Sequence, residues 1–210
     1  EVQDSGSQMA CAALAAKPGE TVIDLCAGAG GKTLAIAAAM NNRGRLIACD
    51  IDRARLSRLP ARAERAGAFA ETRLLNPGKE LAMLADLAGQ ADAVMIDAPC
   101  SGTGTWRRNP EARWRIDPAA IARYSATQAN VLRIGAALVQ PGGRLTYVVC
   151  SLLDAEGAEV VDDFLSNNPD WVVEPVACPA GRARGPGWRL TPLHDATDGF
   201  FFANLRQIGR

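Results

Sequence analysis

Residues 21–33, TVIDLCAGAGGKT, join a short apolar run to a glycine-rich turn and to the start of a helical pattern. The run 21–25 predicts a buried strand, and the glycines allow a tight turn and a close approach of the backbone to a ligand. The glycine spacing matches neither the phosphate-binding pattern G-x-x-x-x-G-K-[ST] nor the dinucleotide pattern G-x-G-x-x-G. The turn therefore favours a nucleoside ligand that lacks a chain of phosphates.

The same alternation of strand and helix continues along the chain. Further apolar runs predict strands at 45–50, 93–97, 144–150 and 200–205, and helical patterns lie between them at 32–40, 53–66, 79–87, 118–139 and 155–166. Such alternation is typical of an α/β fold with a mostly parallel sheet and helices on both faces. Residues 8–16 are compatible with one more helix, and the Gly-, Pro- and Arg-rich segment 175–187 is expected to be a surface loop. We expect residues 1–210 to form a single domain.

Composition narrows the class of protein. The 23 basic and 23 acidic side chains cancel, so a polyanionic partner would need a local patch of charge. No apolar run is long enough for a membrane span, and the first residues do not resemble a secretion signal. The six cysteines form no C-x-x-C pair and there is one histidine, which predicts no metal site. We expect a cytoplasmic protein without a membrane partner, and the first residue, which is not Met, suggests a fragment.

Polar residues stand where the predicted strands end. Asp24, Asp50, Asp97 and Cys150 all lie at or near such ends. In an open parallel sheet, ligands bind outside the carboxyl ends of the strands, so these side chains should surround one site. A carboxylate at Asp50 can accept hydrogen bonds from both hydroxyls of a ribose. Together with the glycine turn, this pattern favours S-adenosylmethionine as the ligand.

Three motifs carry a resemblance to a known family. Residues 24–33, 97–104 (DAPCSGTG) and 147–151 (YVVCS) resemble the Nop/Sun-type RNA cytosine-5 methyltransferases, including bacterial 16S rRNA enzymes. The likeness runs in order along nearly the whole chain, with further matches at 2–8, 107–110, 128, 141–143 and 198–201. It implies a Rossmann-like class I methyltransferase fold with a seven-stranded sheet, S-adenosylmethionine as cofactor, and RNA as partner.

The resemblance also implies a set of cofactor-binding residues: Cys26, Ala27, Gly28, Ala29, Gly30, Gly31, Lys32, Asp50, Arg55, Asn76, Asp97 and Pro99. Two positions depart from the family pattern. Asn76 follows the third strand, where family members usually have an acid that contacts adenine. Val149 precedes the second catalytic cysteine, where the family commonly has threonine; because the two side chains are nearly isosteric, the position of Cys150 should be preserved.

The chemistry explains why cysteines are needed. Carbon 5 of cytosine is a poor nucleophile until a thiolate adds to carbon 6, which is covalent catalysis. Residue spacing does not distinguish the two thiols, but the resemblance assigns the attack to Cys150 and assistance in product release to Cys100. Asp97 would donate a proton or hydrogen bond to ring nitrogen 3, and Lys32 would orient the base or favour the thiolate.

The segment after Cys100 is the predicted RNA contact. Unpaired bases are held by aromatic rings and guanidinium planes, and this stretch offers Trp106, Arg107, Arg108, Trp114 and Arg115. Both tryptophans could instead pack the loop onto the sheet. Ribosomal RNA is favoured as the substrate over transfer RNA, and the family often carries a further RNA-binding region before the first motif, which we expect to be absent from this chain.

Two other functions are compatible with part of the pattern. A DNA cytosine-5 methyltransferase also uses a Pro-Cys pair, but the second cysteine at Cys150 and the short chain argue against it. A non-catalytic RNA-binding or assembly module could retain the cofactor pocket. The presence of Lys32, Asp97, Cys100 and Cys150 together disfavours that alternative. A nucleotide-dependent oxidoreductase would need a glycine fingerprint that residues 26–33 lack.

Overall fold

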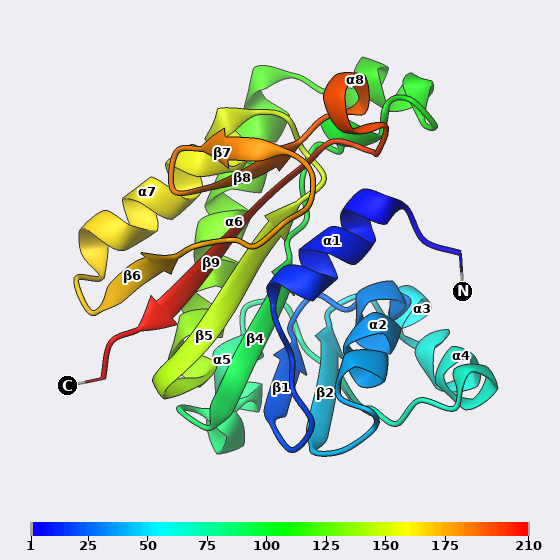
Figure 1. Cartoon of the computed structure of the whole chain (residues 1–210), viewed down its shortest axis with the longest axis vertical. Helices are drawn as coiled ribbons and strands as arrows, with labels where there is room; N and C mark the ends of the chain where they lie inside the picture. The colour runs from blue at the N-terminus through cyan, green and yellow to red at the C-terminus, as the bar shows by residue number, and fades with distance from the viewer. Residues whose placement is uncertain (1, 210) are drawn as a thin grey trace.

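The computed structural model describes residues 2–209 and is built around one twisted sheet (Figure 1). Within these residues the sheet has nine strands in the order β3-β2-β1-β4-β5-β9-β8-β7, and β6 also pairs with β9. The strands are β1 (Thr21–Asp24), β2 (Arg45–Asp50), β3 (Glu71–Leu74), β4 (Ala91–Asp97), β5 (Val139–Val149), β6 (Trp171–Glu174), β7 (Arg182–Arg184), β8 (Gly187–Leu190) and β9 (Phe200–Gln207). The helices are α1 (Ser5–Ala13), α2 (Gly31–Ala39), α3 (Arg53–Leu56), α4 (Leu59–Ala66), α5 (Glu80–Met83), α6 (Pro118–Leu138), α7 (Ala158–Asn167) and α8 (Pro192–Asp195).

The sheet has a parallel part and an antiparallel part. Strands β3, β2, β1, β4 and β5 run parallel, whereas β9 runs antiparallel to β5 and β8 antiparallel to β9. The expected α/β fold with a mostly parallel sheet is confirmed, but the described residues hold nine strands where seven were expected. The expected loop at 175–187 contains β7, which forms a hairpin with β8. These strands are only three and four residues long and have no apolar run, so the sequence pattern did not reveal them.

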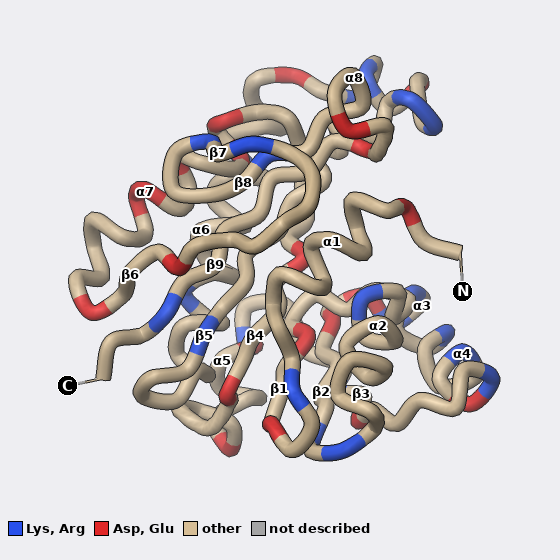
Figure 2. Tube along the Cα trace, in the orientation of Figure 1, with Lys and Arg blue, Asp and Glu red and all other residues tan. Residues whose placement is uncertain are grey.

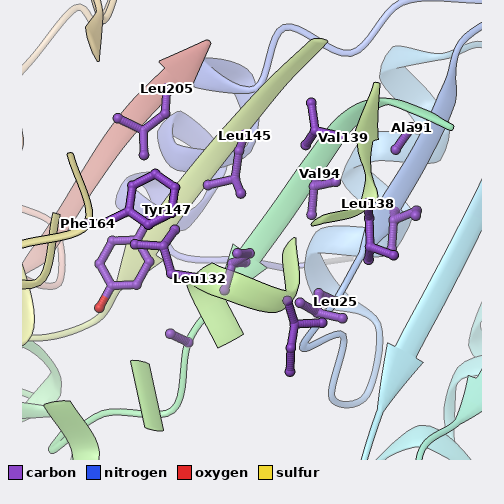
Figure 3. Packing of buried hydrophobic residues seen from close by; sticks show 14 of the residues in the cluster. Leu25, Ala91, Val94, Leu132, Leu138, Val139, Leu145, Tyr147, Phe164 and Leu205 are labelled. Carbon is purple, nitrogen blue, oxygen red and sulfur yellow. The ribbon is translucent and has the colours of Figure 1, made fainter. Parts of the chain in front are cut away.

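Helices cover both faces of the sheet because successive strand residues point to opposite sides. In β4, Val94 and Ile96 face one core with α6 and α7, while Ala93 and Met95 face a second core with α1 and α2. Figure 3 shows the first core, in which Leu132 and Leu138 of α6 lie against strand residues such as Val94, Leu145 and Tyr147. This packing fixes the position of the strand ends.

Helix boundaries differ from the predicted ones for local reasons. The predicted helix at 53–66 is divided into α3 and α4, because Pro60 in the first turn of α4 cannot donate the hydrogen bond that a continuous helix needs. Helix α1 begins at Ser5, where the Asp4 side chain accepts a hydrogen bond from the Gly6 amide. The predicted helix at 79–87 becomes α5 and a 3₁₀ turn, η1 (Ala85–Leu87). Among the described residues, no helix is both long and apolar enough to cross a lipid bilayer.

Candidate active site

A cavity of about 480 Å³ lies at the carboxyl ends of the parallel strands. This volume is in the usual range for small-molecule sites. Its wall contains five of the predicted cofactor residues: Cys26, Asp50, Arg55, Asp97 and Pro99. The thiol-bearing residues Cys100 and Cys150 line the same cavity. The predicted convergence of strand-end side chains on one site is therefore present for Asp50, Asp97 and Cys150.

Asp50 closes the end of the cavity beside the glycine turn. One carboxylate oxygen accepts a hydrogen bond from the Gly28 amide at 2.6 Å, and the other accepts one from the Asp52 amide at 2.7 Å. A carboxylate has about four acceptor positions, so two remain for hydroxyl groups of a ligand. Gly28 has φ +55°, and a Cβ atom built there would lie 2.3 Å from the Arg55 guanidinium. The positive φ favours glycine at this position, and the Arg55 guanidinium lies against its backbone.

Lys32 and Asp97 form an ion pair at the edge of the site. The Lys32 Nζ lies 2.8 Å from Asp97 Oδ2 and 5.6 Å from the centre of the Phe200 ring. Burial alone would lower the pKa of Lys32, but the neighbouring Asp97 carboxylate outweighs it and holds this pKa above its ordinary value. Lys32 is therefore a fixed cation whose main partner is Asp97.

Asp24 lies below this pair and is fully buried. Its Oδ2 accepts a hydrogen bond from Thr33 Oγ1 at 2.6 Å, while its Oδ1 has no hydrogen-bond partner among the described residues. Burial raises the pKa of Asp24 to about 7, and the negative charge of Asp97 adds to the effect. Because Thr33 belongs to α2, this contact fixes the helix that carries Lys32 to the end of β1.

The two cysteines face each other across the ends of β4 and β5. Their Sγ atoms lie 3.4 Å apart, although 50 residues separate them in the chain. The hydrogen bond to Cys150, together with burial, raises the pKa of Cys100 well above its ordinary value. The hydrogen-bond contact with Cys100 lowers the pKa of Cys150 despite burial, and Lys32 adds to this effect. Cys150 is thus the thiol more easily converted to a thiolate.

Backbone contacts fix the loop that follows Cys100. The Gly104 amide donates a hydrogen bond to the Cys150 carbonyl at 3.0 Å, and the Gly199 amide donates to the Gly104 carbonyl at 2.8 Å. A Cβ atom at Gly104 would lie 2.0 Å from the Gly199 oxygen, so only glycine allows this crossing. The crossing joins the two cysteine loops to the turn that precedes β9.

The remaining predicted cofactor residues are not part of the cavity wall. Ala27, Gly28, Ala29, Gly30 and Gly31 form the turn behind it, where the Arg62 side chain donates a hydrogen bond to the Ala29 carbonyl. Asn76 is exposed, and its amide donates to the Met83 sulfur at 3.2 Å. At this end of the cavity the wall is formed by Leu75 and Glu80 instead.

One wall of the cavity was missed by sequence reasoning. It comes from α6 and contains Tyr124, Thr127, Asn130, Val131 and Ile134. These positions recur every three or four residues and therefore share one helix face. The periodicity was visible in the sequence, but a helix face gives no indication of whether it covers the core or a ligand. The structure answers this because α6 extends past the strand ends.

The predicted RNA-contacting residues Trp106, Arg107, Arg108, Trp114 and Arg115 are all exposed. Figure 2 shows basic residues gathered in this segment, with acidic ones near α8 beside it. Arg108 Nε lies 2.5 Å from the buried Asp198 carboxylate, and Arg107 contacts Asp198 and Asp4 at 3.3 Å each. Trp114 is 77% exposed, and the Arg113 guanidinium lies 4.4 Å from its ring centre. The loop is thus anchored through its arginines and presents an aromatic surface.

Comparisons with known proteins agree with this geometry. The family model described as 16S rRNA methyltransferase RsmB/F matches residues 11–206. The chain is 38% identical, over 98% of its length, to ribosomal RNA small subunit methyltransferase B of Thermus thermophilus, and covers 50% of that protein. The chain spans about half the length of the curated relatives it matches.

Solved structures give the same result. A crystal structure of PH0851 matches 99% of this chain with a TM-score of 0.91 and 36% identity, over 47% of its own length. NSun6 from Pyrococcus horikoshii, solved with SFG, matches 99% with a TM-score of 0.86 and 26% identity, over 53% of its length. The Nop/Sun resemblance and the Rossmann-like methyltransferase fold are confirmed. The chain belongs to the 16S rRNA methyltransferase RsmB/F family.

Proposed function

We propose that this chain transfers a methyl group from S-adenosylmethionine to carbon 5 of a cytosine in RNA, with 16S ribosomal RNA as the substrate. The observation that carries the proposal is the pair of thiols 3.4 Å apart on the wall of a ligand-sized cavity. The family description and the names of the relatives support RNA methylation and the ribosomal substrate. The two thiols support methylation at carbon 5 of a pyrimidine, because methylation of a base nitrogen or a ribose oxygen needs no cysteine nucleophile.

The cavity fits S-adenosylmethionine in shape and in chemistry. Asp50 has acceptor positions free for the ribose hydroxyls, and Leu25, Leu75, Val131 and Ile134 provide apolar surface for a flat ring. When bound, the cofactor supplies a methyl group on a positively charged sulfur. The acidic side chains at the strand ends favour that charge.

Cys150 would provide the nucleophile. Its thiolate forms a bond to carbon 6 of the cytosine, and the electron pair of the carbon 5–carbon 6 double bond becomes available at carbon 5 for attack on the methyl group. A base then takes the carbon 5 proton, and the electron pair of that carbon–hydrogen bond restores the double bond while the carbon 6–sulfur bond breaks and releases the Cys150 thiolate. Cys100, at 3.4 Å, can return a proton to that sulfur and so assist the release of the product.

The Asp97–Lys32 pair would stabilise the negative charge that develops on the cytosine ring. Addition at carbon 6 makes ring nitrogen 3 more basic, and a positioned proton donor there lowers the barrier. Lys32 carries a proton and contacts Asp97 at 2.8 Å, so the pair can deliver one to the base through the carboxyl group. The exposed loop 106–115 would hold the surrounding nucleotides through Trp106, Trp114 and Arg115.

Methyl transfer from labelled S-adenosylmethionine tests the proposal. The acceptors are 16S rRNA from a strain that lacks its own enzyme of this family, transfer RNA, and DNA, and the product is identified as 5-methylcytosine by nucleoside mass spectrometry. We expect labelling of the 16S rRNA. Labelling of transfer RNA alone, or of DNA alone, would mean that this nucleic acid and not 16S rRNA is the substrate. Cofactor binding without transfer to any acceptor by the entire gene product would favour the non-catalytic module.

A further inference from the structure

Glu156 is a buried acid that the chemistry above leaves without a role. It ends the 3₁₀ turn η4 (Asp154–Glu156), and its side chain is fully buried. A buried carboxyl group is costly unless hydrogen-bond donors surround it. The identity of its donors therefore indicates what this residue holds in place.

The donors come from the residue that follows each cysteine. Glu156 Oε1 accepts a hydrogen bond from the Ser101 amide at 2.8 Å. Glu156 Oε2 accepts one from Ser101 Oγ and one from Ser151 Oγ, both at 2.5 Å. One carboxylate thus joins the Cys100 loop, after β4, to the Cys150 loop, after β5.

A further contact extends this connection to α6. Gln128 Nε2 donates to the Pro99 carbonyl at 2.9 Å and lies 3.5 Å from Glu156 Oε1. The residues on both sides of Cys100 are therefore tied to a single buried cluster. Small shifts of Glu156 would move the Cys100 sulfur relative to Cys150.

We propose that Glu156 is a positioning residue that holds the two cysteine loops at the separation where the Cys100 and Cys150 sulfur atoms share a hydrogen bond at 3.4 Å. Its role in catalysis rests on the proposed cytosine-5 function, but the thiol geometry does not. In this geometry the pKa of Cys100 is raised and that of Cys150 is lowered.

Other charged groups also act on Cys150. Asp97 opposes the thiolate and Lys32 favours it, while Arg108 interacts with it from the loop beside β9. Substitution of Glu156 leaves all three side chains in the chain. A change in Cys150 reactivity in such a variant would therefore report the Cys100–Cys150 contact.

The test is the pH dependence of iodoacetamide alkylation at each cysteine, followed by mass spectrometry, in wild type and Glu156→Gln. An amide side chain presents an N–H group to donors that need an acceptor, so the cluster must rearrange. We expect the Cys150 profile to move up by about one pH unit, which makes alkylation at neutral pH about tenfold slower. Tyr147→Phe is the matched control, because Tyr147 donates to the Glu156 backbone carbonyl at 2.6 Å and not to its carboxylate.

Folding is monitored by thermal unfolding and by binding of S-adenosylhomocysteine. A folded Glu156→Gln protein with the wild-type Cys150 profile would overturn the proposal. If that variant does not fold, Ser101→Ala decides, because it removes one donor and keeps the Ser101 amide contact. An unchanged Cys150 profile in Ser101→Ala overturns the proposal, and an upward shift supports it.

Methyl transfer separates this proposal from the proposed function. If both hold, Glu156→Gln lowers kcat about tenfold or more and leaves the KM for RNA near the wild-type value. If wild type methylates no RNA but the alkylation profiles shift as expected, the positioning role stands and the cytosine-5 function fails. If wild type is active and Glu156→Gln keeps both the wild-type kcat and the wild-type Cys150 profile, the positioning role is overturned.

Discussion

The two Cys-Ser pairs, residues 100–101 and 150–151, occupy equivalent places at the ends of the neighbouring parallel strands β4 and β5. Both cysteines are half-buried, and both serines donate to Glu156. The cysteines nevertheless differ in acidity, because the pKa of Cys100 is raised and that of Cys150 is lowered. Burial is similar at the two sites, so the contact between the two sulfur atoms at 3.4 Å is the main cause of the difference, and Lys32 adds to it at Cys150. This asymmetry supports the proposal that Cys150 attacks and Cys100 assists.

The largest expected effect is the loss of the proposed nucleophile. Cys150→Ala removes the sulfur that would bond to carbon 6, and we expect methyl transfer to fall at least about a thousandfold. The rate is measured with labelled S-adenosylmethionine at saturating RNA. Cys178→Ala is the matched control, because Cys178 is a half-buried cysteine whose sulfur contacts Met9, away from the cavity. Substantial activity in Cys150→Ala would mean that Cys150 is not the nucleophile.

The second effect concerns the partner thiol. Cys100→Ala should slow turnover about a hundredfold and leave RNA bound covalently to Cys150, because the departing thiolate loses its proton donor. The complex is detected as a slower band on a denaturing gel and disappears in the Cys100→Ala, Cys150→Ala double variant. The same single variant should raise the pH at which Cys150 is alkylated. A trapped complex in Cys150→Ala instead would reverse the two assignments.

The third effect tests whether the ion pair beside the thiols takes part in the reaction. Asp97→Asn keeps the shape of the side chain but cannot relay the Lys32 proton, and we expect kcat to fall about a hundredfold. Asp86→Asn provides a control, since Asp86 pairs with Arg73 on the surface at 2.7 Å. Equal rates for Asp97→Asn and wild type would mean that the Asp97 carboxyl group takes no part in the reaction.

The parallel part of the sheet could be predicted from the sequence, whereas the antiparallel part could be predicted only in part. Strands such as β4 are continuous apolar runs that end in a polar residue, so both the strand and the position of Asp97 were visible. Strand β7 has the sequence RAR and is fully exposed, so it owes its conformation to pairing with β8. Tertiary pairing of this kind leaves no local pattern.

The site shows the same division. Asp50 and Cys150 were found because they end predicted strands. Glu156 was missed because its partner Ser101 lies 55 residues away, and a Glu in a polar segment resembles a solvated surface residue. The contact of Arg108 with Asp198 was also missed, because the burial of this acid could not be inferred from its neighbours in the chain; the predicted contact of Arg108 with RNA stays a prediction.

The smallest expected effect, at most about tenfold in the folding equilibrium per pH unit, is on stability, and it asks whether burial, with Asp97 nearby, raises the pKa of an acid at a third strand end, that of β1. Burial, with Asp97 nearby, raises the pKa of Asp24 from an ordinary 3.8 to about 7. Between these values the folded state binds more protons than the unfolded state, so stability falls as pH rises. Relative to Asp24→Asn, wild type should lose up to about 1.4 kcal/mol of unfolding free energy per pH unit from pH 4 to 7, with no further change above pH 8. Urea unfolding across that range measures the difference. A difference that is constant with pH would mean that Asp24 keeps its ordinary acidity despite its burial.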